Sequence, residues 1–135
     1  MNAPRLYRVI LPVRNLDESV RFYATLLGQA GARVSGGRHY FDCGGVILAC
    51  LDPAGDGDEV VARPNQEHVY FAVDDLEAYH ARAHELGALS PDDVHGAAAG
   101  AIGVRPWGER SFYLHDPTGN PLCFVDERTL FTGRR

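Results

Sequence analysis

Hydrophobic and polar residues alternate along several short segments of the chain, whereas two longer segments repeat apolar residues every three or four positions. Alternation is typical of half-buried strands, and the longer period is typical of amphipathic helices. Residues 6–13 therefore predict a strand, and the segment that follows predicts a helix that Asn15 caps, with Glu18 at the third position after the cap. The expected buried stripe of this helix consists of Leu16, Val20, Tyr23 and Leu27.

Three further strands follow this helix, which Gly28 and Gly31 end. They are expected at residues 32–35, 38–43 and 45–51, with Gly36 and Gly37 as the turn between the first two. The order of elements up to this point is β-α-β-β-β. Residues 53–67 then contain prolines, glycines and acidic residues, which is typical of a solvated connection.

The same pattern restarts at His68. Residues 68–73 predict a strand, and Asp75 is expected to cap a helix that ends before Gly87. The sequence Val13-x-Asn15-Leu16 thus matches Val73-x-Asp75-Leu76, sixty residues later. The chain therefore contains an internal repeat. The expected buried face of the second helix consists of Leu76, Tyr79, Ala83 and Leu86.

The second copy closes with a hairpin over residues 110–127, after a strand near residues 101–106. Two apolar-alternating runs flank a turn in which Asp116 can accept bonds from the turn amides and Gly119 can adopt positive φ. The turn and the start of its second strand read Asp-Pro-Thr-Gly-Asn-Pro-Leu, from Asp116 to Leu122. This hairpin resembles the closing hairpin of the vicinal oxygen chelate superfamily, which includes glyoxalases, extradiol dioxygenases, fosfomycin-resistance proteins and bleomycin-binding proteins.

The repeat and the resemblance together lead to an α+β fold. Neither copy can cover both faces of its small sheet, so two βαβββ modules are expected to pair and form a curled mixed sheet around a cleft, with the helices outside. We expect one domain over residues 1–135, with module one at about 5–52, a linker at 53–67, module two at about 68–127 and a tail at 128–135. The resemblance also implies a homodimer.

Composition narrows the classes of partner. The chain has 135 residues, which suffices for one sizeable core, and a net charge of -5. The basic pair Arg134-Arg135 is its only cluster of positive charge, so neither nucleic acid nor a membrane is an expected partner. The three cysteines are widely spaced in apolar runs, which is typical of reduced thiols and favours a cytoplasmic protein.

The resemblance also implies where metal ligands would lie. In metal-using relatives, the first and last strands of each module supply His and Glu side chains, and those positions fall here on Arg8, on Leu48 or Ala49, on His68 and on Cys123. Arginine and aliphatic side chains cannot ligate a metal, and thiolate sulfur is too soft for magnesium or manganese. We therefore expect no metal and no other cofactor.

The expected ligand is instead a small organic molecule, anionic or aromatic. His68 is either a hydrogen-bond partner and candidate general base or a strand-start histidine bonded to backbone or water. Arg8 either binds an anionic group of the ligand, or forms a salt bridge with an acid such as Glu109, or extends its charged tip into solvent. Tyr40 is a further aromatic candidate. The predicted ligand-binding residues are Arg8, His68, Tyr70, Trp107, Tyr113 and Cys123.

Three functions remain open at this point. The first is a metal-free protein that binds a small molecule. The second is an enzyme, either a metal-dependent lyase or dioxygenase with displaced ligands such as Asp42, Glu109 or His115, or a metal-free isomerase that uses His68 and a tyrosine. The third is a dimeric interaction protein with a collapsed cleft.

Overall fold

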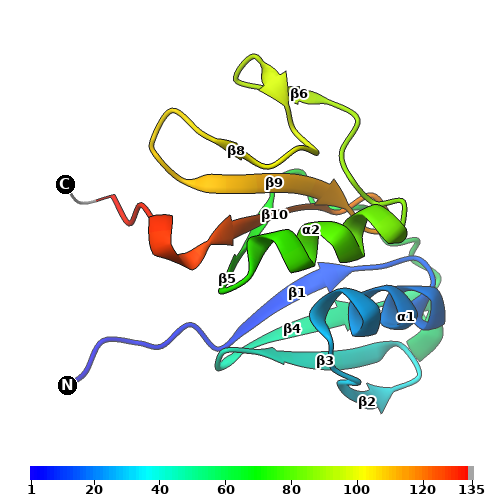
Figure 1. The fold of residues 1–135 in the computed structure, drawn as a ribbon. Helices are drawn as coiled ribbons and strands as arrows, with labels where there is room; N and C mark the ends of the chain where they lie inside the picture. Colours follow the sequence, from blue (N-terminus) through cyan, green and yellow to red (C-terminus); the bar gives the residue numbers. More distant parts are fainter. Residues whose placement is uncertain (134–135) are drawn as a thin grey trace. The chain divides into compact units, whose positions relative to one another are not determined.

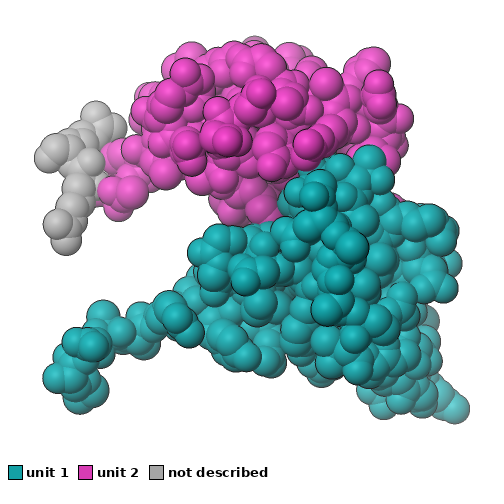
Figure 2. All heavy atoms as spheres, turned by 60° about the horizontal axis from the view of Figure 1, so that its bottom comes forward, with its two compact units in different colours: residues 1–65 teal, residues 66–135 magenta. Residues whose placement is uncertain are grey.

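The computed structural model describes residues 1–133, and the basic pair Arg134-Arg135 lies outside this range. The chain divides into two compact units, residues 1–65 and residues 66–135, which Figure 2 distinguishes by colour. Among residues 1–133, no helix is both long and apolar enough to cross a membrane.

The first unit is a four-stranded mixed sheet with one helix. Its strands are β1 (Arg8–Pro12), β2 (Ala32–Ser35), β3 (Arg38–Cys43) and β4 (Val46–Leu51), and its helix is α1 (Leu16–Leu27). The sheet order is β1-β4-β3-β2, with β1 parallel to β4 and the other pairs antiparallel. A short 3-10 helix, η1 (Pro53–Asp56), begins the connection to the second unit.

The second unit repeats this arrangement, as Figure 1 shows. Strands β5 (Val69–Val73), β8 (Gly103–Val104), β9 (Arg110–His115) and β10 (Pro121–Asp126) form a sheet of order β5-β10-β9-β8 beside helix α2 (Leu76–Glu85). Strand β10 is parallel to β5 and antiparallel to β9. A small hairpin, β6 (Asp93–Val94) and β7 (Ala97–Ala98), and a 3-10 helix, η2 (Glu127–Thr129), are added to it. The predicted β-α-β-β-β repeat and the α+β class are confirmed.

Both helices begin as the sequence predicts. The Asn15 side chain accepts a hydrogen bond of 3.0 Å from the backbone N–H of Glu18, and the Asp75 side chain accepts one of 3.1 Å from the backbone N–H of Ala78. Each cap satisfies one of the donors that the first turn of a helix leaves without an intrahelical partner. Helix α1 ends at Gly28, whose φ of 69° is favourable only for glycine.

The buried face of α1 differs from the predicted stripe. Val20 and Leu27 are half-buried, whereas Phe22 and Leu26 are buried. Leu16 and Tyr23 are buried as predicted, and Tyr23 packs toward Phe41 of β3 with ring centroids 6.1 Å apart. The buried residues of α1 are Leu16, Ser19, Phe22, Tyr23 and Leu26.

Two strand boundaries and the buried face of α2 also differ from the prediction. His68 precedes its strand by one residue, and the strand expected near residues 101–106 is only the two-residue β8. In α2, Tyr79 and Leu86 are half-buried, whereas Leu76 and Ala83 are buried. The shortness of β8 follows from its surroundings, because Pro106 has no N–H for a sheet ladder and Gly108 adopts a φ of 95° in the turn that follows.

The closing hairpin forms as predicted, and Asp116 organises its turn. One carboxylate oxygen, Oδ1, accepts hydrogen bonds from the backbone N–H groups of Thr118, Gly119 and Asn120 at 2.9 to 3.0 Å. The other oxygen, Oδ2, accepts one of 2.8 Å from the Asn120 side-chain amide. Asp116 and Asn120 are both buried, so these bonds satisfy polar groups that water cannot reach.

Each sheet has a face that packs on its helix and a reverse face. In the second unit the helix face carries Phe71, Phe112 and Phe124, and Tyr79 of α2 lies with its ring centroid 5.3 Å from that of Phe124. Residues at alternating positions of the same strands point to the opposite side. We call the side of each sheet that points away from its own helix its reverse face.

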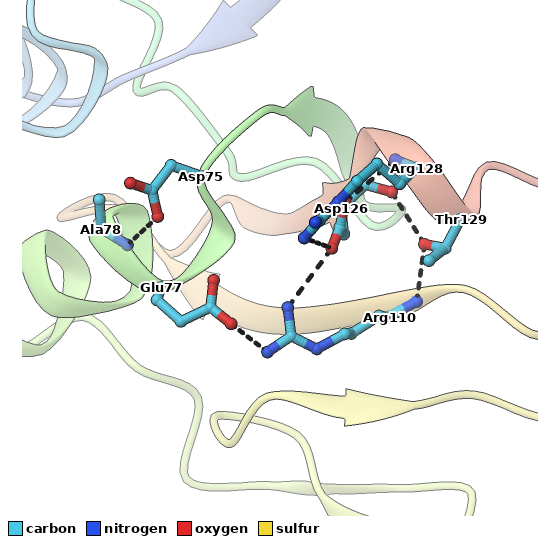
Figure 3. A network of polar contacts seen from close by, with 7 residues as sticks. All are labelled: Asp75, Glu77, Ala78, Arg110, Asp126, Arg128 and Thr129. Carbon is cyan, nitrogen blue, oxygen red and sulfur yellow. Dashed lines mark hydrogen bonds and ion pairs between the residues drawn. The ribbon is translucent and has the colours of Figure 1, made fainter.

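A charged network joins the end of β10 to α2 (Figure 3). Asp126 is 2% exposed and accepts bonds from the Arg128 guanidinium at 2.8 and 3.0 Å. Arg110 bridges Asp126, at 3.4 Å, and Glu77 of α2. Hydrogen bonding by Arg128, reinforced by Arg110, holds the pKa of the Asp126 carboxyl well below its usual range. The network therefore favours the ionised carboxylate and ties strand, helix and η2 together.

Asp126→Asn is expected to lower the melting temperature at neutral pH. Because the folded-state pKa is depressed, the stabilisation is complete above the unfolded value of about 4 and is lost as the pH falls through the lower folded value. The difference in melting temperature between wild type and variant should therefore narrow in acid, as measured by thermal unfolding from neutral to low pH. The control is Glu77→Gln, which should lower the melting temperature less because the Glu77 side chain is far more exposed than that of Asp126. A difference that stayed constant down to strongly acidic pH would contradict this account.

Candidate functional site

Four of the predicted ligand-binding residues gather on the reverse face of the second unit. The strand register places Cys123 of β10 between Tyr70 of β5 and Tyr113 of β9. His68, just before β5, lies with its ring centroid 5.0 Å from that of Tyr113 and 6.1 Å from that of Tyr70. Residues 68 and 70 have the same parity, so both point away from α2. The structure therefore brings His68, Tyr70, Tyr113 and Cys123 together.

These four side chains are uncharged near neutral pH. Burial, with a smaller effect of His115, lowers the pKa of His68 below its ordinary value, against an opposing effect of Glu67. Burial raises the pKa of Tyr113 to about 12 and that of Cys123 to about 11. Burial likewise raises the pKa of Tyr70. The group therefore consists of a neutral imidazole, two phenols and a thiol that is a poor nucleophile and a poor metal ligand.

Arg105 belongs to the same face, and the sequence analysis missed it. It follows β8, is 3% exposed, and lies with its guanidinium carbon 5.1 Å from the ring centroid of Tyr113. Its Nε donates to Ser111 Oγ at 3.0 Å, and its Nη2 donates to the backbone oxygens of Ser111 at 2.8 Å and of Ala101 at 3.1 Å. The segment around Arg105 shows no alternation, so its parity could not be read. The available signal was an arginine directly before a proline at the end of an otherwise apolar segment.

Trp107 does not join this group in its described contacts. It lies in the turn between β8 and β9, where its indole N–H donates to Glu109 at 2.6 Å and its ring lies 5.0 Å from that of His95. The other Glu109 oxygen accepts a bond of 2.9 Å from the backbone N–H of Phe131. These contacts are those of a residue that holds the turn in place.

Arg8 lies on the reverse face of the first unit. Its guanidinium carbon is 4.8 Å from the ring centroid of Tyr7 and 5.3 Å from that of Tyr40, and its Nη2 donates to the Tyr7 hydroxyl at 3.2 Å. Among the described residues of this unit, no carboxylate forms an ion pair with Arg8. Arg8 is exposed, so its charge remains available to solvent or to a ligand.

The register also decides between the two aliphatic candidates for the last strand of the first unit. Ala49 pairs with Ile10 and Tyr40, on the face that carries Arg8, whereas Leu48 pairs with Val9 and Phe41 on the helix face. Ala49 therefore occupies the place that corresponds to Cys123 in the second unit.

A divalent metal does not fit these residues. Arg8 and Ala49 offer no donor atom, and Cys123 carries a protonated thiol, which leaves the His68 ring as the single ordinary ligand. Of the possible displaced ligands, Asp42 accepts a bond of 2.8 Å from Gly45 in a turn, and Glu109 is used by Trp107 and Phe131. Within each unit, taken over residues 1–133, no three His, Cys, Asp or Glu side chains form a cluster that could hold a metal.

The chain is similar in structure to several solved proteins. A glyoxalase/bleomycin resistance protein from Albidiferax ferrireducens matches with a TM-score of 0.70 at 23% identity, over 89% of this chain and 96% of that one. Lactoylglutathione lyase from Agrobacterium tumefaciens matches with a TM-score of 0.65 at 21% identity, over 93% and 96% of the two chains. Oxidase ChaP-H2 matches with a TM-score of 0.70 at 25% identity, over 93% and 94%.

No curated protein matches the sequence significantly. The model of the glyoxalase-like domain family does match it, over residues 8–125, which span both units from the start of β1 to the last residues of β10. This match agrees with the superfamily resemblance of the closing hairpin and the repeat. The chain belongs to the glyoxalase-like domain family.

Proposed function

We propose that this protein binds a small aromatic or anionic organic molecule on the reverse faces of its sheets, without a resident metal. The observation that carries the proposal is the grouping of His68, Tyr70 and Tyr113 around Cys123 in the second unit. Aromatic side chains with polar tips suit a flat organic ligand, because they combine apolar area with hydrogen-bonding groups.

Tyr70 is the residue of this group best placed to contact a ligand. It is 56% exposed, although it is a large aromatic side chain in the middle of a strand. Tyr113 and Cys123, by contrast, are buried in a cluster with Ala99 and Val125 on the same face. A ligand that stacked on Tyr70 would gain apolar contact that the protein itself does not use.

Arg8 supports the anionic part of the proposal in the first unit. Its guanidinium is held beside the rings of Tyr7 and Tyr40, and stacking of this kind fixes its orientation without consuming its positive charge. An arginine held in this way can present a planar fork to a carboxylate or phenolate. Arg8 is therefore our candidate for recognition of an acid group at the first unit.

The names of the similar structures include a resistance protein, a lyase and an oxidase, so the fold alone does not select a reaction. The residues favour binding, because the family's metal positions carry no adequate donor set here. The homodimer implied by the resemblance and the cytoplasmic location inferred from the cysteines both stay predictions.

A metal-free isomerase is a second candidate, and the lowered pKa of His68 favours it. A histidine that is neutral near pH 7 can accept a proton from carbon next to a carbonyl group, and the neighbouring phenols can donate a hydrogen bond to the resulting enolate oxygen. In an α-hydroxy ketone or aldehyde, the hydroxyl proton then moves to the enolate oxygen and His68 returns its proton to the former carbonyl carbon. The carbonyl and hydroxyl groups thus exchange places, and the reaction needs no oxidant or other co-reactant.

The purified protein is expected to contain less than stoichiometric zinc, iron, manganese or nickel. A chelator should leave its melting temperature unchanged, because an ion that bound only the folded state would stabilise that state. Elemental analysis and thermal unfolding with and without chelator provide the measurements. One ion per chain, together with a lower melting temperature after its removal, would overturn the metal-free proposal.

Tyr70→Ala is expected to weaken binding of a flat aromatic ligand such as benzamide by roughly two- to tenfold, since an aromatic pair contributes about 0.5–1.5 kcal/mol. Its melting temperature should change little, because the side chain is mostly exposed. Tyr70→Phe is the matched control, which keeps the ring and should keep most of the affinity. Titration calorimetry of the three proteins makes the comparison. Equal affinity for Tyr70→Ala and wild type would remove Tyr70 from the site.

His68→Gln tests the isomerase candidate. If His68 is the base, the wild type should exchange the carbon-bound hydrogens of hydroxyacetone with deuterium oxide, and the variant should do so about 100-fold more slowly or worse. Because the pKa of His68 is lowered, the wild-type rate should stay constant from neutral to mildly acidic pH and then fall as the ring protonates. Proton NMR follows the exchange. Wild-type exchange at the buffer rate would eliminate this candidate and leave the binding proposal intact.

A further inference from the structure

The guanidinium of Arg105 is held in place by hydrogen bonds from two of its three nitrogens. Nε and Nη2 together donate three hydrogen bonds to Ser111 Oγ and to the backbone oxygens of Ser111 and Ala101, at 2.8 to 3.1 Å. The Tyr113 ring lies 5.1 Å from the guanidinium carbon. Nη1 is the remaining nitrogen, and within residues 1–133 it has no hydrogen-bond partner.

The positive charge of Arg105 is not neutralised by its neighbours. Among the described residues of the second unit, no carboxylate lies within ion-pair distance of it. The Tyr113 hydroxyl and the Cys123 thiol on the same face also supply no negative charge near neutral pH. Burial raises the pKa of Tyr113 to about 12 and that of Cys123 to about 11, so both groups stay protonated. Burying an unpaired charge is costly, even when neutral groups accept its hydrogen bonds. The residue is nevertheless only 3% exposed.

A glycine leaves Nη1 uncovered. Gly103 of β8 lies opposite Ser111 of β9, the residue that anchors Arg105. A Cβ atom at Gly103 would lie 3.2 Å from Nη1 and 3.6 Å from the guanidinium carbon. Among the described residues, two side-chain polar atoms are fully buried without a hydrogen-bond partner, and these are Ser19 Oγ and His39 Nδ1. Nη1 is not one of them, although it also lacks a partner. Nη1 is therefore not fully buried, and no side chain at position 103 covers it.

We propose that Arg105 Nη1 is an oxyanion-binding subsite and that the ligand is a small organic carboxylate or phenolate that presents one oxygen to it. This inference rests on the proposed function and deepens it by naming the charged group of the ligand. The contact involves one nitrogen, because Ser111 and Ala101 occupy Nε and Nη2 and thereby prevent the two-pronged contact that a free guanidinium makes. The aromatic body of the ligand then lies toward Tyr113 and Tyr70, on the same face.

A purely structural role for Arg105 predicts something different. If its three hydrogen bonds served only to hold residues 101–105 against β9, loss of the residue would lower stability without changing the preference among ligands. The two roles are separable by a variant that covers Nη1 with a methyl group and requires the guanidinium to move by only a few tenths of an ångström. Gly103→Ala is such a variant, because the backbone of Gly103 is not in the left-handed region and the added methyl group meets only the guanidinium.

The experiment uses the full chain and four proteins: wild type, Arg105→Lys, Gly103→Ala and the control Val104→Ala. Val104 is adjacent in β8 and 72% exposed, so its truncation controls for a change in the strand itself. Benzoate and para-nitrophenolate are the anionic probes, benzamide is the neutral one, and acetate is an anion without a ring. Titration calorimetry measures affinity, and thermal unfolding measures stability.

Wild type and Val104→Ala are expected to bind benzoate about tenfold or more tightly than benzamide, the factor expected of one charge-assisted hydrogen bond. Gly103→Ala should lose this preference while it keeps its benzamide affinity and its melting temperature to within a few degrees. Arg105→Lys should lose it as well, because an ammonium cannot keep the three anchoring bonds and also present a fixed N–H. A tighter contact with para-nitrophenolate than with benzoate would identify the phenolate as the preferred group.

The remaining outcomes separate failure of this inference from failure of the proposed function. Equal wild-type affinity for benzoate and benzamide, or an anion preference that Gly103→Ala leaves unchanged, would overturn the Arg105 subsite and leave aromatic binding standing. Absence of binding by both aromatic probes, with acetate raising the melting temperature of wild type but not of Gly103→Ala, would support the oxyanion subsite and overturn the aromatic ligand. No response to any of the probes would overturn both.

Discussion

Strand β10 imposes the register on which the second unit depends. All six of its residues are buried, so neither of its faces is free to turn toward water. Its alternation sends Leu122, Phe124 and Asp126 toward the helix face, and Cys123 and Val125 toward the reverse face. A slip of one residue would place a thiol among the phenyl rings and a phenylalanine between Tyr70 and Tyr113. The candidate site and the core are thus set by one ladder of hydrogen bonds.

Polar groups at both ends of β10 hold this register in place. Before the strand, the buried carboxylate of Asp116 fixes the turn, and at its end Asp126 is held by Arg128 and Arg110. Both carboxylates are nearly inaccessible to water, so their hydrogen bonds cannot be exchanged for solvent without a large cost. The same register places Ser111 opposite Val125, and Ser111 is the residue that orients Arg105.

Most of the fold could be predicted because its signals are local. The helix caps at Asn15 and Asp75, the repeat of sixty residues and the hairpin turn each depend on a few adjacent residues. Strand parity indicated that Tyr70 and Tyr113 share a face, and the superfamily resemblance singled out His68. Arg105 could not be found in this way, since it follows a two-residue strand, and its burial depends on Ser111 of the neighbouring strand and on Ala101. The buried face of α1 was predicted correctly at Leu16 and Tyr23 but not at Phe22 and Leu26, because the apolar positions of this helix fit more than one stripe.

The two units place a guanidinium beside equivalent tyrosines. Tyr40 pairs with Ala49 in the first unit as Tyr113 pairs with Cys123 in the second, and the nearest arginine carbons lie 5.3 and 5.1 Å from the two rings. The arginines themselves are not equivalent, because Arg8 begins the first strand of its sheet and Arg105 follows β8, the second strand of its sheet in chain order. Repetition of one ancestral module therefore does not explain the pair. In each unit a cation thus lies beside an electron-rich ring, a contact that stabilises the guanidinium and leaves its net positive charge able to attract an anionic oxygen.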